Sequence, residues 1–155
     1  MAEIKWAESA HHLPIEAFSP NPKNPKKHTK KQLEHIRNSI LHFGFLDPIG
    51  VWGKEHVVVE GHGRLEALKQ LVQDGKIRIP AEGVPCIMLD HLSKRDRDAY
   101  MLEHNQSTME TPWDDDLLDD VLGDIADEGL DMEQFGFELP GEEGGEDGKY
   151  TSSIN

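Results

Sequence analysis

Residues 57–71, VVVEGHGRLEALKQL, constrain the fold of this 155-residue chain more than any other stretch. Three consecutive valines indicate a buried strand, because β-branched side chains fit a pleated sheet. Leu65, Leu68 and Leu71 then recur at the spacing of one helix face, which predicts a helix over residues 65–72. A strand that passes through a short glycine turn directly into a helix predicts a small α/β fold.

Charge is distributed unevenly along the chain, whose net charge is −14. Residues 1–109 contain 15 Lys or Arg against 14 Asp or Glu, whereas residues 110–155 contain one Lys against 16 Asp or Glu. The first part is therefore nearly neutral and the second part strongly acidic. Because apolar residues make up only 36% of the chain, we expect some of it to lie outside a packed core.

Cys86 is the single cysteine, which excludes a disulfide framework and a cysteine-based zinc site. No apolar run approaches the ~20 residues that a membrane helix needs. The first ten residues lack the apolar core of a signal peptide. We therefore expect a cytoplasmic protein with no membrane partner.

Capping patterns predict where the other helices begin. Thr29 opens a capping box ahead of an apolar stripe that Gly44 is placed to end. Ser93 opens a helix that runs towards Asn105, and the aspartates at 114–116 suit the first turn of a further, acidic helix. Strands are expected over residues 13–18, 48–52, 56–60 and 84–89.

These elements divide the chain into four segments. They are an N-terminal arm over residues 1–11, an α/β domain over 12–109, an acidic helical extension over 110–139 and a disordered tail over 140–155. Within the extension, residues 130–137 carry two phenylalanines and are expected to fold back onto the rest of the chain.

The turn between strand and helix concentrates residues that bind anions. A glycine turn that opens a helix directs backbone N–H groups and the positive end of the helix dipole at one point. Gly61 and Gly63 let a ligand approach the backbone closely, and Arg64 offers two donors to a phosphate. His62 can bind a phosphate oxygen or transfer a proton, and Glu60 can hold a metal ion or accept a proton.

A purely structural interpretation fits the same residues equally well. Short glycine patterns occur by chance in many turns. In that case the turn only joins the strand to the helix, and Arg64 pairs with Glu60 or Glu66.

The order of the motifs resembles the N-terminal domain of the ParB family. A proline-rich segment, NPKNPKKH, is followed by HFGFLDPIGVW, VVVEGHGRLEALKQL, VPCIMLDHLSKRDRDAYMLEHNQST and WDDDLL. The chain is most similar to ParB-like domains of phages and mobile elements that accompany DNA methyltransferases. The resemblance covers roughly residues 12–137.

The resemblance implies a ParB/sulfiredoxin-like fold, with a small mixed sheet and flanking helices, that binds a nucleoside triphosphate. Partition ParB proteins hold the phosphates of CTP on a Gly-Glu-Arg-Arg turn. Gly61 and Arg64 match the first and last positions of that turn, whereas His62 and Gly63 differ. The implied ligand is CTP or ATP with Mg²⁺, and Glu60 is the candidate for metal binding.

Two related turns bear on the chemistry. Sulfiredoxins carry Gly-Cys-His-Arg, and the absence of the cysteine here argues against their redox reaction. A free-serine kinase carries Asp-Gly-His-His-Arg, which residues 60–64 follow in part, so Glu60 and His62 are the candidate catalytic residues. A second ParB motif, Glu-Asn-x-x-Arg, has a counterpart in Asn105, for which a phosphate contact and a helix C-cap are equally open.

Five lysines lie within residues 23–31: Lys23, Lys26, Lys27, Lys30 and Lys31. They suit the phosphates of DNA, and a solvated surface segment is the alternative.

We therefore expect a ParB-like nucleotide-binding domain that acts in phage or plasmid DNA metabolism, with NTPase or nuclease activity left open. The alternative is a non-catalytic adaptor that binds DNA or a protein such as a DNA methyltransferase. A homodimer is open in both cases.

Overall fold

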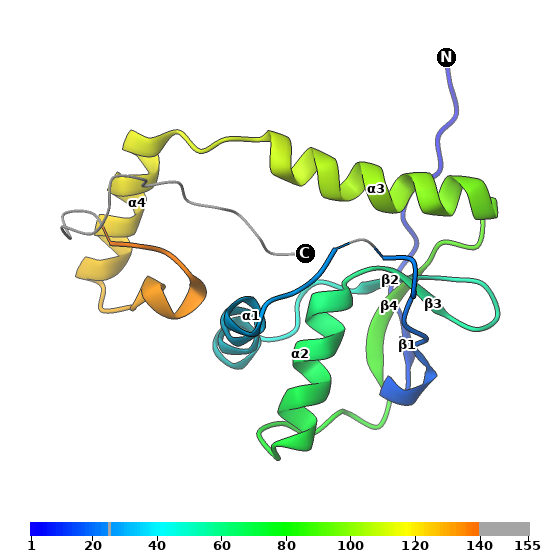
Figure 1. Cartoon of the computed structure of the whole chain (residues 1–155), viewed down its shortest axis with the longest axis horizontal. Coiled ribbons are helices and arrows are strands. Elements are labelled where there is room, and N and C mark those ends of the chain that lie inside the picture. Colours follow the sequence, from blue (N-terminus) through cyan, green and yellow to red (C-terminus); the bar gives the residue numbers. More distant parts are fainter. Residues whose placement is uncertain (25, 140–155) are drawn as a thin grey trace.

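The computed structural model describes residues 1–24 and 26–139 (Figure 1). In this part of the chain four strands form one sheet in the order β1-β4-β2-β3. β1 lies antiparallel to β4, β4 parallel to β2, and β2 antiparallel to β3, so the small mixed sheet is confirmed. The strands are β1 (His11–Leu13), β2 (Ile49–Trp52), β3 (Val57–Glu60) and β4 (Val84–Met88).

Helices flank this sheet, as predicted. α2 packs against the sheet and α1 against α2, while α3 crosses the domain in contact with β3 (Figure 1). The helices are α1 (Lys30–Phe43), α2 (His62–Gln73), α3 (Lys94–Glu110) and α4 (Asp115–Asp127), with 3-10 turns η1 (Ile15–Ala17) and η2 (Met132–Phe135). Within the described residues, no helix combines the length and the apolar character that crossing a membrane requires.

The core lies between α2 and the central strands. β2 and β3 sit next to each other and are almost completely buried, which explains why their sequences read as continuous apolar runs. The buried core side chains are Phe18, Ile49, Val51, Val58, Leu65, Leu68, Val84 and Cys86. Burial raises the pKa of the Cys86 thiol, so this cysteine is a packing residue.

Two predicted boundaries were wrong. The strand expected over residues 13–18 is a short β1 followed by η1, because Pro14 ends the strand and caps the 3-10 turn. The helix expected from residue 65 begins at His62, since only Gly61 is needed for the turn.

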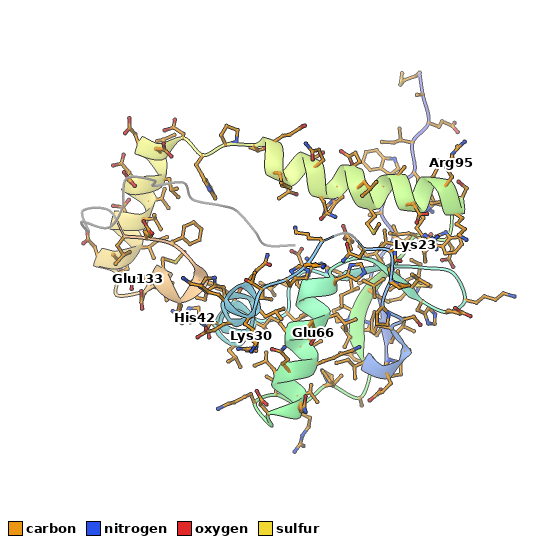
Figure 2. The ribbon with its side chains drawn as sticks, in the orientation of Figure 1. Lys23, Lys30, His42, Glu66, Arg95 and Glu133 are labelled. Atoms are coloured by element: carbon orange, nitrogen blue, oxygen red, sulfur yellow. The ribbon has the colours of Figure 1, made fainter. Side chains whose placement is uncertain are left out.

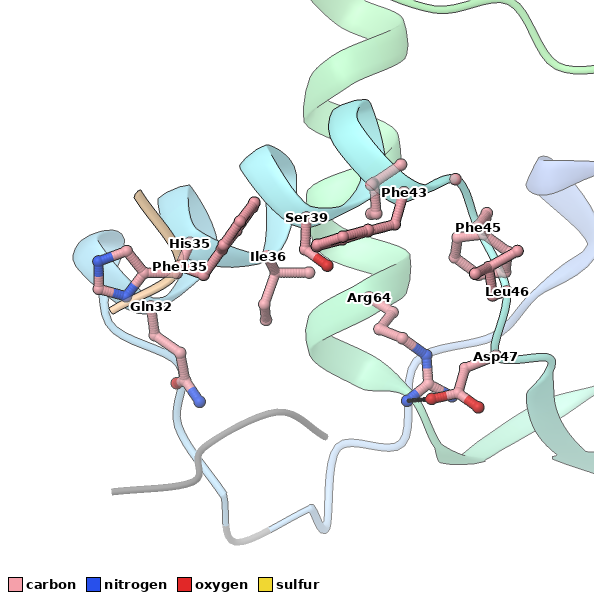
Figure 3. A pocket seen from close by; sticks show the side chains of 12 residues that line it. Gln32, His35, Ile36, Ser39, Phe43, Phe45, Leu46, Asp47, Arg64 and Phe135 are labelled. Carbon is pink, nitrogen blue, oxygen red and sulfur yellow. Dashed lines mark ion pairs between the residues drawn. The ribbon is translucent and has the colours of Figure 1, made fainter. Parts of the chain in front are cut away.

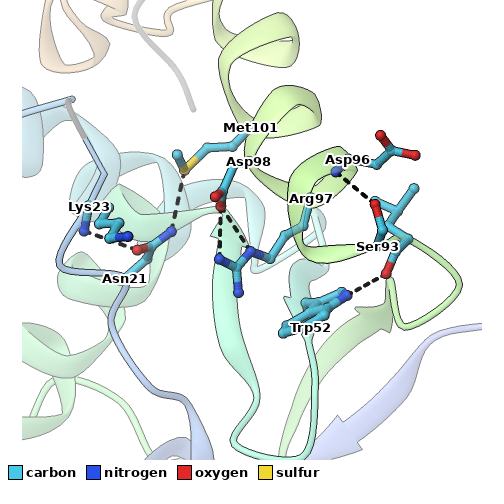
Figure 4. A network of polar contacts seen from close by, with 9 residues as sticks. Asn21, Lys23, Trp52, Ser93, Asp96, Arg97, Asp98 and Met101 are labelled. Carbon is cyan, nitrogen blue, oxygen red and sulfur yellow. Dashed lines mark hydrogen bonds and ion pairs between the residues drawn. The ribbon is translucent and has the colours of Figure 1, made fainter.

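α3 is anchored to the sheet by its first half (Figure 4). The Arg97 guanidinium stacks on Trp52 at 4.5 Å from the ring centroid and pairs with Asp98 at 2.8 Å. Asn21 Nδ2 donates to Met101 Sδ at 3.6 Å. α3 continues to Glu110, so the interpretation of Asn105 as a helix C-cap was wrong: it lies inside the helix.

The acidic extension folds back onto α1, as expected. The Asp114 carboxylate accepts a hydrogen bond from the Leu117 amide, which confirms the predicted cap of α4. η2 follows α4 and places the Phe135 ring 5.1 Å from that of Phe43, and Asn38 Nδ2 donates to the Gln134 carbonyl at 2.9 Å. The tail predicted over 140–155 lies outside the described residues.

Candidate functional site

Gly61 forms the whole turn between β3 and α2. Its backbone is left-handed, with φ 94° and ψ 19°, a conformation that glycine adopts without cost. A Cβ atom here would lie 3.0 Å from Arg64 Nη2 and 3.3 Å from Ile49 Cγ1. The left-handed conformation therefore favours glycine at this position, and a Cβ atom would in addition press on Arg64 and Ile49.

The first turn of α2 faces a hollow between three parts of the chain. The residues that line it come from the segment before α1, from the end of β3 with the start of α2, and from α3. They are Asn24, Lys26, His28, Val59, Glu60, Gly61, His62, Arg64, Met101, His104 and Asn105. The free space, about 10 Å³, is that of roughly one water molecule, so a larger anion would have to displace side chains that line the hollow.

His62 is the first residue of α2, and its imidazole is mostly buried in this hollow. Burial lowers its pKa from 6.5 to about 4, and His28 adds to the shift. His62 is thus uncharged at neutral pH, so it offers a hydrogen bond and no positive charge. Its Nε2 is buried and has no hydrogen-bond partner in the part of the chain that the structure describes.

Arg64 is the third residue of α2, within its first turn, and its side chain is only 12% exposed. Nη2 donates to the Pro48 carbonyl at 3.1 Å, and Nη1 lies 3.9 Å from the Asp47 carboxylate. The expected alternative partners, Glu60 and Glu66, do not pair with it in the described structure. Its buried Nε likewise lacks a partner among the described residues.

Glu60 ends β3 and is fixed by two residues that the sequence did not suggest. Its Oε2 lies 3.1 Å from His104 Nε2 on α3. Gly50 pairs with it on β2, where a Cβ atom would come within 2.6 Å of Glu60 Cγ. Neither residue carried a local signal, because both meet Glu60 only through the tertiary fold.

The predicted DNA-binding lysines separate into two groups. Lys26 is half-buried and lines the hollow, and burial lowers its pKa. The others are exposed and lie outside the hollow: Lys23, Lys27, Lys30 and Lys31. Figure 2 shows Lys23 and Lys30 at the two ends of this segment.

The described residues of the hollow offer few groups that could bind a metal ion. In the described residues no three His, Cys, Asp or Glu side chains converge as a metal site. Glu60 is the one carboxylate among the described residues that line the hollow. Mg²⁺ is often held by one or two carboxylates together with substrate phosphates, so the residues fit a nucleotide-bound Mg²⁺ and not an independent one.

Two curated proteins resemble this chain. The ParB-like nuclease domain-containing protein YnaK of Escherichia coli is 30% identical over 80 residues, which cover 52% of this chain and 82% of YnaK. A probable chromosome-partitioning protein ParB of Campylobacter jejuni is 37% identical over 62 residues, 38% of this chain and 22% of that ParB. The chain thus spans under a quarter of the partition protein.

A solved structure and a family model also match this chain. The C-terminally truncated chromosome-partitioning protein ParB from Caulobacter crescentus, complexed with CTP-gamma-S, superimposes with a TM-score of 0.57 at 22% identity. The superposition covers 84% of this chain and 67% of that one, and it supports the fold. The ParB N-terminal domain model matches residues 2–106. This chain therefore belongs to the ParB N-terminal domain family.

Proposed function

We propose that this domain binds a nucleoside triphosphate, with its phosphates at the N-terminus of α2. The observation that carries the proposal is the buried Nε2 of His62, which lacks a partner among the described residues and lies where the α2 dipole favours an anion. Lys26 and Arg64 supply positive charge in the same hollow, and Gly61 lets the phosphates approach the backbone. Asn105 contributes a contact from α3.

CTP is the first ligand to test, because a ParB of this fold is complexed with CTP-gamma-S. ATP is the second, since His62 and Gly63 stand where partition ParB proteins have Glu and Arg. Mg²⁺ bound to the nucleotide would neutralise phosphate charge beside Glu60. If the site hydrolyses its ligand, Glu60 is the candidate base, held by His104.

A thermal-shift titration with CTP, ATP, GTP and ADP, with and without Mg²⁺, tests the proposal. A ligand at 100 times its Kd stabilises the folded state by ~2.7 kcal/mol. We expect a shift with at least one triphosphate that Arg64→Ala abolishes and Arg95→Ala preserves, because the Arg95 side chain is 86% exposed and does not line the hollow. Wild-type protein that is stabilised by none of these ligands would refute nucleotide binding.

DNA binding by the exposed lysines is a second candidate function. Lys30 and Lys31 occupy the first turn of α1, where the helix dipole disfavours positive charge. Their charges therefore do not stabilise the helix. We expect Lys27→Gln/Lys30→Gln/Lys31→Gln to weaken binding to a DNA duplex and to reduce its salt dependence by roughly 0.9 per lost phosphate contact. Lys54→Gln/Lys76→Gln/Lys94→Gln, which removes the same number of charges at other exposed positions, is the matched control. Equal affinities for the two variants would argue against this surface.

We further propose that this activity serves phage or plasmid DNA metabolism beside a DNA methyltransferase, in the cytoplasm and with a homodimer as one form. The order of the sequence motifs, which resembles that of phage-type ParB-like domains, supports this proposal. Co-purification of this chain with a co-expressed DNA methyltransferase, followed by the size of the complex, is the direct test. An adaptor would keep this interaction in Arg64→Ala, whereas a nucleotide-dependent partner would lose it.

A further inference from the structure

The acidic extension contacts the domain mainly through η2. The Phe135 ring of η2 lies 5.1 Å from the Phe43 ring, and both side chains line a cavity of about 220 Å³ between α1, the loop that follows it and η2 (Figure 3). α4 contacts η2, and its buried side chains are Leu118 and Leu122. Because η2 lies between α4 and α1 (Figure 1), the remaining surface of α4 faces solvent.

This solvent-facing surface of α4 carries apolar side chains. Leu117 and Val121 are four residues apart, so they are neighbours on the helix surface, and they are 62% and 54% exposed. Trp113, just before the Asp114 cap, is 42% exposed. A single exposed apolar side chain is common in proteins, whereas several together are a feature of interaction surfaces.

Aspartates accompany these apolar side chains. Asp120 follows Leu117 by three residues and Asp124 follows Val121 by three, so each carboxylate lies beside an apolar side chain. Both aspartates are exposed, and neither takes part in an ion pair within the described residues. α4 contains no Lys or Arg that could neutralise them.

Helix capping does not explain these two aspartates. The aspartates at 114–116 lie at the start of α4, where the helix dipole favours negative charge. Asp124 lies in the last turn, where the dipole disfavours negative charge and no basic residue offsets it. Asp120 lies in the middle of the helix, outside the reach of either end. Their charges therefore contribute little to the stability of α4 and suit a partner.

The charge of this surface restricts what can cover it. The same surface of a second copy carries the same aspartates, so two such surfaces would repel each other. Residues 140–155 contain four Asp or Glu against one Lys, so this segment is acidic as well. A positively charged partner with apolar side chains is the complementary occupant.

We propose that the exposed face of α4, formed by Trp113, Leu117, Asp120, Val121 and Asp124, docks a basic amphipathic helix of a partner protein. Apolar side chains of that helix cover Leu117 and Val121, and its Lys or Arg side chains pair with the two aspartates. An apolar seam flanked by complementary charges is how paired helices select each other. None of these five residues lines the hollow, so this docking is separate from nucleotide binding.

The first test removes the apolar part of the face. Fluorescence anisotropy measures the binding of the full chain to a labelled model peptide that has leucines along one helix face and lysines beside them. Leu117→Ser/Val121→Ser should raise the Kd about tenfold, because two apolar contacts are lost. Leu41→Ser/Leu102→Ser, at similarly exposed positions on α1 and α3, is the matched control and should bind as wild type does.

The second test removes the charges. Asp120→Asn/Asp124→Asn should raise the Kd about fivefold at low salt and less at high salt, because salt screens exposed charge pairs. Glu55→Gln/Glu82→Gln removes two exposed carboxylates outside α4 and should leave the Kd unchanged. A scrambled peptide of the same composition should bind wild type about tenfold more weakly, since its leucines no longer share one face.

Several results would overturn this docking site. They are no binding of the amphipathic peptide, equal Kd values for Leu117→Ser/Val121→Ser and its control, and equal Kd values for the amphipathic and scrambled peptides. Sedimentation velocity of wild type without peptide adds a further check. Self-association that Leu117→Ser/Val121→Ser abolishes would assign the face to a second copy of this chain and overturn the proposed partner.

Discussion

The first turns of α1 and α2 are built in opposite ways. At α1, Thr29 has an extended backbone and its hydroxyl accepts a hydrogen bond from the Gln32 amide at 3.1 Å. At α2, Gly61 is left-handed and no described side chain caps the helix. Ser93 caps α3 and Asp114 caps α4 as Thr29 caps α1. Three described helices are thus completed by their own side chains, and α2 is not.

This difference changes how the first turns of α1 and α2 are stabilised. A side-chain cap contributes ~1 kcal/mol, which α2 forgoes. The first turn of α2 also contains no acidic residue, so nothing in it offsets the positive end of the dipole, and Arg64 adds to that charge. The anion that we propose at this helix start would supply the missing stabilisation, whereas α1 has its own side-chain cap.

Gly61→Ala, at the start of α2, is the substitution from which we expect the largest effect. The left-handed backbone costs alanine ~1–2 kcal/mol, and the contacts with Arg64 and Ile49 add to this, so we expect a loss of at least ~2 kcal/mol in urea unfolding. Nucleotide binding should be lost as well, because Arg64 has to move.

Gly53→Ala is the matched control for that substitution. Gly53 also has a positive φ, 82°, but a Cβ atom there would meet none of the described atoms within 4 Å. Gly53→Ala should lose only the ~1–2 kcal/mol that the left-handed backbone costs alanine, and nucleotide binding should be unchanged. If both variants lost equal stability and both bound nucleotide, the close approach at Gly61 would have no role.

The buried imidazole of His62 makes the stability of the protein depend on pH. Its pKa is about 4 in the folded protein against an ordinary 6.5, so between these values the unfolded chain binds the proton more strongly. Stability is therefore full above pH 6.5 and falls as the pH approaches 4, by on the order of 1 kcal/mol for this partly exposed ring.

Melting temperatures of wild type and His62→Gln between pH 7 and pH 4 check this prediction. The variant should lose less stability over that range than wild type, whereas His91→Gln, which removes an exposed imidazole, should follow wild type. Parallel curves for wild type and His62→Gln would show that this imidazole is not buried in its neutral form.

The same contrast shows what the sequence could predict. The caps at Thr29, Ser93 and Asp114 were predicted correctly, because a cap depends on residues within one turn. The strand over Val57–Glu60 was predicted for the same local reason. The start of α2 was placed three residues late, since Gly63 weakened the helical pattern even though it lies within the helix.

Distant contacts could not be predicted from local patterns. His104 meets Glu60 only because α3 crosses β3, and Phe135 lines a cavity with Arg64 only because η2 returns to α1. Asn105 was interpreted equally as a C-cap or a ligand contact, and the length of α3 removes the first. The position of the site was thus encoded locally, but its surroundings depend on tertiary packing.

Removing the side-chain caps of α1 and α3 tests the same contrast at helices that have a cap. Thr29→Ala and Ser93→Ala should each destabilise the protein by about 0.5–1 kcal/mol, because an exposed amide loses its acceptor to water. Nucleotide affinity should stay unchanged in Ser93→Ala, whose cap lies outside the residues of the hollow. Urea unfolding gives the first quantity and calorimetry the second. A loss of affinity in Ser93→Ala would show that α3, and not α2 alone, sets the anion site.

The smallest expected change concerns the lysines in the first turn of α1. Lys30→Gln/Lys31→Gln removes two positive charges from the positive end of the helix, so it should stabilise the protein by a few tenths of a kcal/mol, about 0.3 per charge at low salt. Urea unfolding at low and high salt measures this gain, which should vanish at high salt because screening removes the dipole interaction. If the same variant also binds DNA more weakly, the chain keeps two lysines that disfavour its own helix because they serve a ligand. A variant that is less stable than wild type would instead show that these lysines support the fold, and α1 would then differ from α2 only in its cap.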